Sequence, residues 1–308
     1  MKISLVVTVK NEEGAVSVFL ESILGQTLKP SEVVVVDGGS TDDTVGAIRR
    51  FTGERKAPFP IRLFELQGAN IARGRNRGIS EANGDLIAIS DAGCVLDESW
   101  LREITAPFEH EDVMIVAGNY RVEARGLWEA GVRAMTIPDP SRVAGALPSS
   151  RSIAFRKRLW EQAGGYPEDL DWAEDTAFAL AVKRSGVIIN FAPSAIVHWW
   201  PRGTPVSTFV QYLRYAIGDG MAGHFRRHYL LRCIGALVLI AMIALPLRTD
   251  QRIDWIYPAA FVMAYWLYFM GKVPPTMRIA RNLLLSLPVL LISDAGRVIG
   301  YLIGMIRK

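Results

Sequence analysis

The sequence predicts an α/β domain with a Rossmann-like, mostly parallel sheet, followed by an α-helical membrane region. Short runs of β-branched residues alternate with helical patterns in the first two thirds of the chain, which is typical of a parallel sheet covered on both faces. Polar residues follow the ends of these runs. Long apolar stretches gather after Tyr229, and the mean hydropathy of +0.19 is high for a soluble enzyme.

The composition excludes several classes of protein. The chain has 308 residues, 21% of them charged, and 35 Lys+Arg against 31 Asp+Glu give a formal net charge of +4. This excludes a disordered chain, and the length predicts about two units at ~100–200 residues each. Two cysteines, Cys94 and Cys233, are too few for a disulfide framework or a cysteine zinc site. Basic residues beside apolar stretches, without an aromatic platform, argue against a nucleic-acid partner.

The predicted elements follow from apolar periodicity. Ile3 to Val9 is short, β-branched and apolar, as expected of a strand buried on both faces. Ser40 or Thr41 can cap the helix after the second strand. Lys183 and Arg184 in a last turn, followed by Gly186, end another helix. The predicted strands are 3–9, 32–36, 61–66 and 86–90, and the predicted helices include 15–24, 71–82 and 171–184.

Composition divides the chain into an α/β domain at 1–205, a basic juxtamembrane segment at 206–229 and a membrane region at 230–308. Apolar helices are predicted at about 230–247, 255–271 and 283–306, near the ~20 residues that a bilayer requires. Arg214, Arg226, Arg227 and His228 mark the cytoplasmic edge of the first. In the last stretch Asp294 and Arg297 lie at i, i+3. This pair is either buried between helices, or the stretch lies in the interface.

Chemistry is expected at the carboxyl ends of the strands, where parallel sheets bind ligands. Lys10, Asn11, Glu12, Asp37 and Asp91 follow strand ends in this way. Each acidic residue alone could merely cap a turn, but together they predict a binding site. The run Met1 to Val9 is too short for a signal peptide, so we expect this domain in the cytosol.

Five motifs carry a resemblance to family 2 glycosyltransferases. They are Val-Thr-Val-Lys-Asn-Glu-Glu at 7–13, Val-Val-Asp-Gly-Gly-Ser-Thr-Asp-Asp-Thr at 35–44, Arg-Asn-Arg-Gly-Ile with Ala-Asn-Gly-Asp at 75–85, Ser-Asp-Ala-Gly-Cys at 90–94 and Ala-Glu-Asp-Thr at 173–176. The resemblance covers about 1–198 and implies a GT-A fold, a nucleotide-sugar donor and inversion at the anomeric carbon. The apolar end is similar to that of membrane-attached members that build surface polysaccharides or glycolipids.

The resemblance implies roles for individual residues at the donor site. The end of the first strand and Asp37 would hold the nucleoside, and an arginine at 73 or 75 would lie near the base or the phosphates, although either could equally be a solvated helix residue. Arginine suits such a place because its planar fork stacks and pairs with anions. The implied donor-binding residues are Thr8, Val9, Asn11, Glu12, Asp37, Arg73, Arg75, Asp91 and Ala92.

A divalent cation, Mg²⁺ or Mn²⁺, is expected to neutralise the departing diphosphate. The family uses an Asp-x-Asp element for this ion, but here Gly93 replaces the second carboxylate. Asp91 remains as a ligand, and His198 resembles a histidine that several GT-A enzymes bring to the metal. His198 lies beside two tryptophans, so a packed core histidine is the alternative. Asp97 could replace the missing carboxylate, but a helix cap suits it better.

Transfer to a hydroxyl requires a general base. Glu174 and Asp175 fall in the first turn of the helix at 171–184, and adjacent helical residues point about 100° apart, so only one can face the acceptor. The resemblance makes Asp175 the base and Glu174 its support; the alternative is that both only complement the helix dipole. The segment 126–150, with Trp128, is expected to shape the acceptor pocket.

These observations predict an inverting glycosyltransferase on the cytoplasmic face of the cell membrane, acting on a membrane-associated glycan or a lipid-linked acceptor. UDP, GDP and dTDP sugars all fit. Transfer to polyprenyl phosphate is a second hypothesis, which needs no base. A catalytically weak, nucleotide-sugar-binding scaffold of a polysaccharide assembly system is a third, motivated by the broken Asp-x-Asp element. The acceptor and the oligomeric state stay open.

Overall fold

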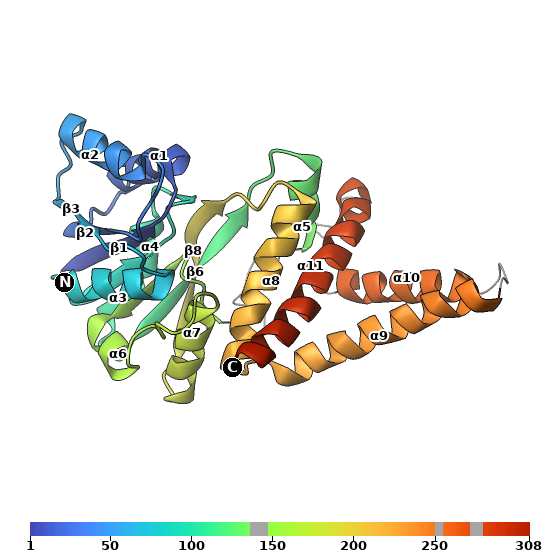
Figure 1. The fold of residues 1–308 in the computed structure, drawn as a ribbon. Helices are drawn as coiled ribbons and strands as arrows, with labels where there is room; N and C mark the ends of the chain where they lie inside the picture. The colour runs from blue at the N-terminus through green and yellow to red at the C-terminus, as the bar shows by residue number, and fades with distance from the viewer. Residues whose placement is uncertain (136–146, 250–254, 272–279) are drawn as a thin grey trace. The chain divides into compact units, whose positions relative to one another are not determined.

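The computed structural model describes residues 1–135, 147–249, 255–271 and 280–308 (Figure 1). Their contacts divide the chain into two compact units. The sheet unit comprises Met1–Val122 and Pro138–Trp200, and the helical unit comprises Glu123–Ile137 and Pro201–Lys308. The sequence predicted one boundary near 205; in the structure the chain enters the helical unit twice, because the short segment after residue 122 packs with the C-terminal helices.

Among the described residues, eight strands form one sheet in the order β3-β2-β1-β4-β7-β6-β8-β5. The first four strands of this order are parallel, and β1 pairs with β2 on one side and β4 on the other. β7 is antiparallel to both of its neighbours. The strands are β1 Ile3–Val9, β2 Glu32–Asp37, β3 Ile61–Glu65, β4 Leu86–Ile89, β5 Cys94–Leu96, β6 Ile115–Val122, β7 Ile153–Arg156 and β8 Ile189–Trp199.

Alternate side chains of the strands pack into two hydrophobic cores, one on each face of the sheet. In β1, Leu5 and Val7 join one core while Val6 joins the other, which explains the unbroken apolar run. One face is covered by α1 Glu13–Leu24, α2 Thr44–Glu54 and α4 Trp100–Thr105. The opposite face is covered by α3 Ile71–Glu81, α6 Lys157–Gln162 and α7 Glu174–Arg184.

The expected fold class is confirmed, with two local differences. The helix after β2 begins at Thr44 rather than directly after Ser40 or Thr41, because the loop first folds back onto the end of β1. The second half of the sheet, β5 to β8, is mixed rather than parallel. Its strands were not predicted, because they lack the β-branched runs of the first half.

Helix α3 lies unusually close to the sheet. A Cβ atom at Gly78 would come within 2.5 Å of the Val6 Cγ1 atom, and one at Gly74 within 2.9 Å of the Thr8 Cγ2 atom. These two glycines are one helical turn apart and therefore share the face that contacts β1. The close approach places the side chains at the start of α3 beside the strand ends.

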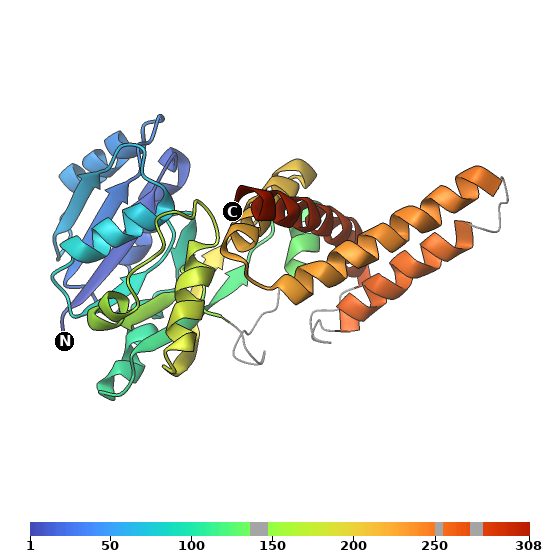
Figure 2. The same cartoon turned by 60° about the horizontal axis from the view of Figure 1, so that its bottom comes forward.

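The helical unit contains α5 Leu127–Met135, α8 Pro205–Ala222, α9 Arg226–Thr249, α10 Ile256–Gly271 and α11 Ala280–Arg307. Two of its helical stretches, Arg226–Ala244 and Leu285–Arg307, are long and apolar enough to cross a membrane, and Ile256–Tyr268 is apolar but shorter. Both views show α9 and α10 running side by side (Figures 1 and 2).

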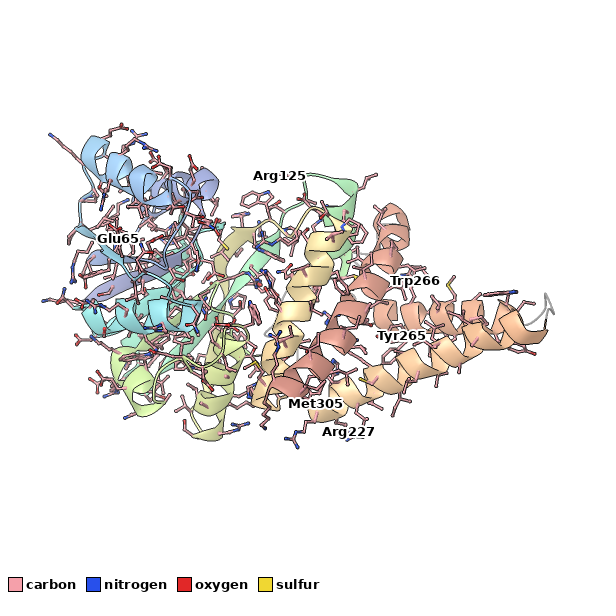
Figure 3. All side chains as sticks on the ribbon, viewed as in Figure 1. Glu65, Arg125, Arg227, Tyr265, Trp266 and Met305 are labelled. Atoms are coloured by element: carbon pink, nitrogen blue, oxygen red, sulfur yellow. The ribbon has the colours of Figure 1, made fainter. Side chains whose placement is uncertain are left out.

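The Asp294 carboxylate joins three helices of this unit. Its Oδ1 atom accepts hydrogen bonds from Arg232 of α9 at 2.6 Å and from Arg297 of α11 at 2.9 Å. Its Oδ2 atom accepts one from the hydroxyl of Tyr265 of α10, whose neighbour Trp266 donates to Ser286 of α11 at 2.9 Å (Figure 3). The acidic residue thus lies between helices, the first of the two arrangements that the sequence allowed.

Helices α8 and α11 pack through glycines spaced four residues apart. A Cβ atom at Gly300 would lie 2.2 Å from the backbone oxygen of Leu213, and one at Gly304 would lie 2.2 Å from that of Ile217. Backbone atoms cannot move aside as a flexible side chain can. Small residues at such spacing allow helix backbones to approach closely.

We expect Gly300→Leu to destabilise the helical unit by about 1–3 kcal/mol or more, because the new side chain forces α8 and α11 apart. Gly235→Leu on α9 is the matched control, since a Cβ atom there meets nothing within 4 Å. Thermal unfolding of the detergent-purified protein measures both. Equal melting temperatures for the two variants would contradict the close α8–α11 packing.

Candidate active site

The carboxyl ends of β1, β2 and β4 meet at one edge of the sheet, because these strands are parallel neighbours. Thr8 and Val9 end β1, Asp37 ends β2, and Asp91 with Ala92 follows β4. The structure therefore brings together the predicted residues of three separate motifs. Thr8 is partly exposed, whereas Val9 and Ala92 are buried, so Val9 and Ala92 can present only backbone atoms to a ligand.

The loops after β1 and β2 are joined by hydrogen bonds. The Asn11 side-chain oxygen accepts from the Thr41 backbone N–H at 2.8 Å, and the Ser40 hydroxyl accepts from the Asn11 N–H at 2.9 Å. The Glu12 N–H donates to the Thr44 hydroxyl at 2.8 Å. Asn11 has a positive φ of 57°, which is rare outside glycine and concentrates at functional sites. The two loops thus form one preorganised edge.

The Asp37 side chain serves its own loop. It is 1% exposed, and its Oδ2 atom accepts from the backbone N–H groups of Gly39 at 2.9 Å and Ser40 at 3.0 Å. The Ser40 hydroxyl donates to Oδ1. In the structure this carboxylate therefore caps its own turn, as the alternative interpretation has it. The loop that it shapes lies where the nucleoside is expected.

Arg75 is the centre of the site's buried charges. Its guanidinium is paired with Glu174 of α7 and, at 3.0 Å, with the Asp91 Oδ1 atom. It also lies 5.4 Å from the centre of the Tyr166 ring, a cation–π arrangement. The side chain is 3% exposed. Arg73, the other candidate, is half exposed and lies 3.9 Å from Glu168.

The electrostatics of this group follow from burial and pairing. Burial alone would lower the pKa of Arg75, but the Glu174 and Asp91 carboxylates outweigh it and hold the pKa above its ordinary value. Burial raises the pKa of Glu174, Arg75 lowers it, and Asp175 and Asp91 raise it, so that the pKa lies at about 7. A permanently charged arginine thus binds two acidic residues from different elements.

Two asparagines of the α3 region hold the chain that leads to α7. The Asn76 side chain donates to the Tyr166 carbonyl at 2.8 Å and accepts from the Tyr166 N–H at 2.9 Å. Asn70, which caps α3, donates to the Glu168 carbonyl at 2.8 Å. Asn76 was not predicted as a site residue. Its place in the motif at 75–79 could have indicated a site residue. Its partner Tyr166, however, lies ninety residues away in the sequence, so only the fold shows the contact.

Helix α7 begins at Glu174, three residues later than predicted, because Ala173 adopts a left-handed conformation with φ 62°. This strained residue reverses the chain directly before the two acidic residues. Glu174 then points into the protein and is 5% exposed, whereas Asp175 is only partly buried. The Asp175 Oδ1 atom accepts from the Thr176 N–H at 2.7 Å. The two carboxylates therefore have different surroundings.

The residues at the expected metal position supply one carboxylate. The Asp91 side chain is 33% exposed, and no group of three or more His, Cys, Asp and Glu residues that could hold a metal ion occurs in the described part of the chain. His198 of β8 pairs with Val95 of β5, four residues after Asp91. Asp97 accepts from the Ser99 N–H at 3.1 Å, so it shapes the turn before α4, whose N-cap residue is Ser99. A cation shared with a diphosphate still fits, because Mg²⁺ often takes one or two carboxylates plus substrate phosphates.

The expected acceptor segment, 126–150, is described only in part. Helix α5 belongs to the helical unit, where Trp128 donates to the Thr208 hydroxyl at 2.9 Å. The Pro138-Asp139-Pro140 part of this prediction lies outside the described residues.

The fold and this site define the class of protein: a GT-A domain with an acidic and basic cluster at the ends of its parallel strands. Residues 4–159 match the family described as Glycosyl transferase family 2, and residues 86–270 match Glycosyl transferase family group 2. The chain belongs to glycosyl transferase family 2. The expected family and enzyme class, a glycosyltransferase, are thereby confirmed.

The chain is also similar to individual bacterial glycosyltransferases. The chain is 26% identical over 196 residues to the uncharacterized glycosyltransferase EpsJ of Bacillus subtilis, covering 59% of this chain and 56% of EpsJ. It is 22% identical over 232 residues to the O-antigen chain rhamnosyltransferase RfbN of Salmonella typhimurium, covering 69% of this chain and 70% of RfbN. The match thus spans little more than half the length of EpsJ.

A solved structure shares the fold. The mannosyltransferase PcManGT of Pyrobaculum calidifontis, in complex with GDP-Man and Mn²⁺, superposes with a TM-score of 0.68 at 19% identity. The likeness covers 96% of this chain and 87% of that one. It supports the GT-A fold.

Proposed function

We propose that this protein is an inverting glycosyltransferase that moves a sugar from a nucleotide-diphosphate donor to a hydroxyl of a membrane-associated glycan or lipid-linked acceptor. The observation that carries this proposal is the Arg75 cluster. It joins Asp91, at the expected diphosphate position, to Glu174, whose neighbour Asp175 is partly exposed. A donor-side acid and the residue next to the candidate base are thus held by one buried cation.

The donor would bind at the edge formed by the loops after β1 and β2. Asn11 and Glu12 belong to the first loop, and Asp37 orders the second loop through its backbone N–H groups. Arg73 begins α3 beside this edge and has a half-exposed side chain that can reach an anion. In this arrangement Arg75 is a positioning residue, since its guanidinium is committed to two carboxylates.

The acceptor oxygen would attack the anomeric carbon while the bond from that carbon to the diphosphate oxygen breaks. The attacking hydroxyl gives its proton to Asp175, and the leaving diphosphate carries away the bonding electron pair. Attack from the face opposite the leaving group inverts the anomeric carbon. Glu174 keeps α7 attached to Arg75 and so keeps Asp175 in place.

A divalent cation would be held by Asp91 together with the donor's diphosphate, with His198 as a further candidate ligand. Bound there, it would neutralise charge on the leaving group. The Mn²⁺ in the PcManGT complex supports this proposal for the fold. A Cβ atom at Gly93 would meet nothing within 4 Å. The backbone therefore has room for a carboxylate side chain at this position, although the sequence does not supply one.

The helical unit would attach the enzyme to the cytoplasmic face of the cell membrane. Its apolar stretches at Arg226–Ala244 and Leu285–Arg307 support this proposal, with Arg226, Arg227 and His228 at the start of the first. Basic residues beside membrane helices favour the cytoplasmic side. Membrane attachment would keep the acceptor, itself held by lipid, within reach of the sheet unit.

The proposal is tested with a panel of nucleotide sugars on the detergent-purified full chain, scored by release of the nucleoside diphosphate. UDP, GDP and dTDP sugars are each supplied with Mg²⁺, with Mn²⁺ and with a chelator. We expect turnover with one nucleotide and a loss of turnover with chelator. Binding of a donor without turnover under any condition would instead favour the scaffold hypothesis.

A further inference from the structure

Arg151 lies at the same edge of the sheet as Asp91, although it belongs to none of the motifs. β7 runs antiparallel to β4 with Ile89 opposite Ile153, so the residues directly before β7 lie at the edge of the sheet where β4 ends. Arg151 lies in the turn before β7, two residues from Ile153. The Ser152 carbonyl accepts from the Gly118 N–H of β6 at 2.8 Å, which ties this turn to the sheet.

Two aromatic rings hold the Arg151 guanidinium. Its carbon lies 4.5 Å from the centre of the Trp199 ring, at the end of β8, and 5.8 Å from that of the Tyr120 ring of β6. The two rings meet edge to face with centroids 6.2 Å apart. Stacking engages the face of a guanidinium, whereas its N–H donors lie in its plane. The rings thus orient a charged group at the edge of the sheet.

Strand pairing places Arg151 near the turn that carries Asp91. Trp199, the ring on which Arg151 stacks, lies opposite Cys94 in the pairing of β5 with β8. The Cys94 N–H donates to the Asp91 carbonyl at 3.0 Å, so Cys94 closes the turn that begins at Asp91. The first loop, with Glu12, follows β1, the parallel neighbour of β4, and therefore lies at the same edge of the sheet.

We propose that Arg151 binds the diphosphate of the donor and of the released nucleoside diphosphate. The inference rests on the proposed function and adds a residue to its donor site. Two carboxylates, Asp91 and Glu12, face this region, and a diphosphate brings more negative charge, which favours a fixed cation beside it. An arginine can bind phosphate oxygens through two parallel hydrogen bonds. It would do so beside the turn in which Gly93 stands at the position of the missing second carboxylate.

The test measures nucleotide binding by titration calorimetry on the detergent-purified full chain, with Mg²⁺ present. The probes are UDP, GDP and dTDP and their monophosphates, UMP, GMP and dTMP, which lack the second phosphate. We expect Arg151→Met to weaken binding of the preferred diphosphate by about 10- to 100-fold, the range for losing a charged hydrogen-bonding group. Binding of the monophosphate should change by less than about threefold, on the same scale. Arg151→Lys, which keeps the charge and loses the fork, should lie between.

Arg102→Met is the control, since the Arg102 side chain is exposed on α4 and pairs with its neighbour Glu103 at 3.0 Å. It should bind like the wild type. Thermal midpoints of all variants check folding. If the wild type binds a diphosphate and Arg151→Met keeps the full affinity, the inference is wrong while the proposed function stands. Where Arg151→Met does not fold, full affinity of Arg151→Lys has the same meaning. If the wild type binds none of the probes, both fall together.

Discussion

Asp175→Asn should reduce the turnover number by about 10²- to 10⁴-fold, the usual contribution of a general base. The amide keeps the size of the side chain and can still accept a hydrogen bond from the Thr176 N–H, but it cannot take the proton of the attacking hydroxyl. Affinity for the nucleoside diphosphate should stay close to that of the wild type, because Asp175 lies on the proposed acceptor side. Steady-state transfer assays and calorimetry measure the two effects separately.

Asp169→Asn is the matched control for this substitution. Asp169 lies six residues earlier, is exposed, and has no role in the proposed chemistry. It should leave turnover unchanged. Full turnover in Asp175→Asn would contradict the base assignment and would favour the polyprenyl-phosphate hypothesis, because an anionic acceptor needs no base.

Arg75→Met should cost roughly 3–5 kcal/mol of stability, since it leaves the buried Glu174 carboxylate without its cation. At ~2–4 °C per kcal/mol, the melting temperature should fall by about 6–20 °C. Arg77→Met is the control on the same helix. Arg77 pairs with Glu81 at 2.9 Å on the surface, where such pairs contribute little.

The destabilisation of Arg75→Met should depend on pH. Burial already raises the pKa of Glu174 to about 7, and removing Arg75 takes away the one charge that lowers it. A carboxyl whose pKa is raised in the folded state favours folding when it is protonated, and this contribution is lost as pH rises through the folded-state pKa. The variant should therefore be less impaired at pH 5.5 than at pH 8.

The double variant Arg75→Met, Glu174→Gln separates charge from packing. A neutral Gln removes the unpaired buried charge, so the double variant should recover part of the lost stability and lose the pH dependence. Thermal melts across pH measure this. A double variant that is less stable than Arg75→Met at pH 8 would show that packing, not charge, dominates the cluster.

The sequence alone was enough for the first half of the sheet unit. The runs at 3–9, 32–36 and 86–90 are β-branched and buried on both faces, so their apolar content marks them without tertiary information. The sequence also predicted that Asp37 and Asp91 lie at one edge of the sheet, because the carboxyl ends of neighbouring parallel strands meet there. The apolar stretches of the helical unit were equally visible, because a bilayer demands length and composition.

Only the tertiary structure decided which groups meet. The predicted ligand roles of Asp37 and Arg75 stay predictions, and the structure adds their partners: Asp37 bonds to its own loop, whereas Arg75 meets Asp91 and Glu174 through long-range folding. Arg151 carried no local signal, because its place depends on β7, an antiparallel strand that pairs with β4, 64 to 70 residues earlier in the chain. Periodicity reports which face of an element is apolar. It cannot report which distant charge a buried side chain will find, since that depends on pairing and on the close approach that glycines such as Gly78 allow.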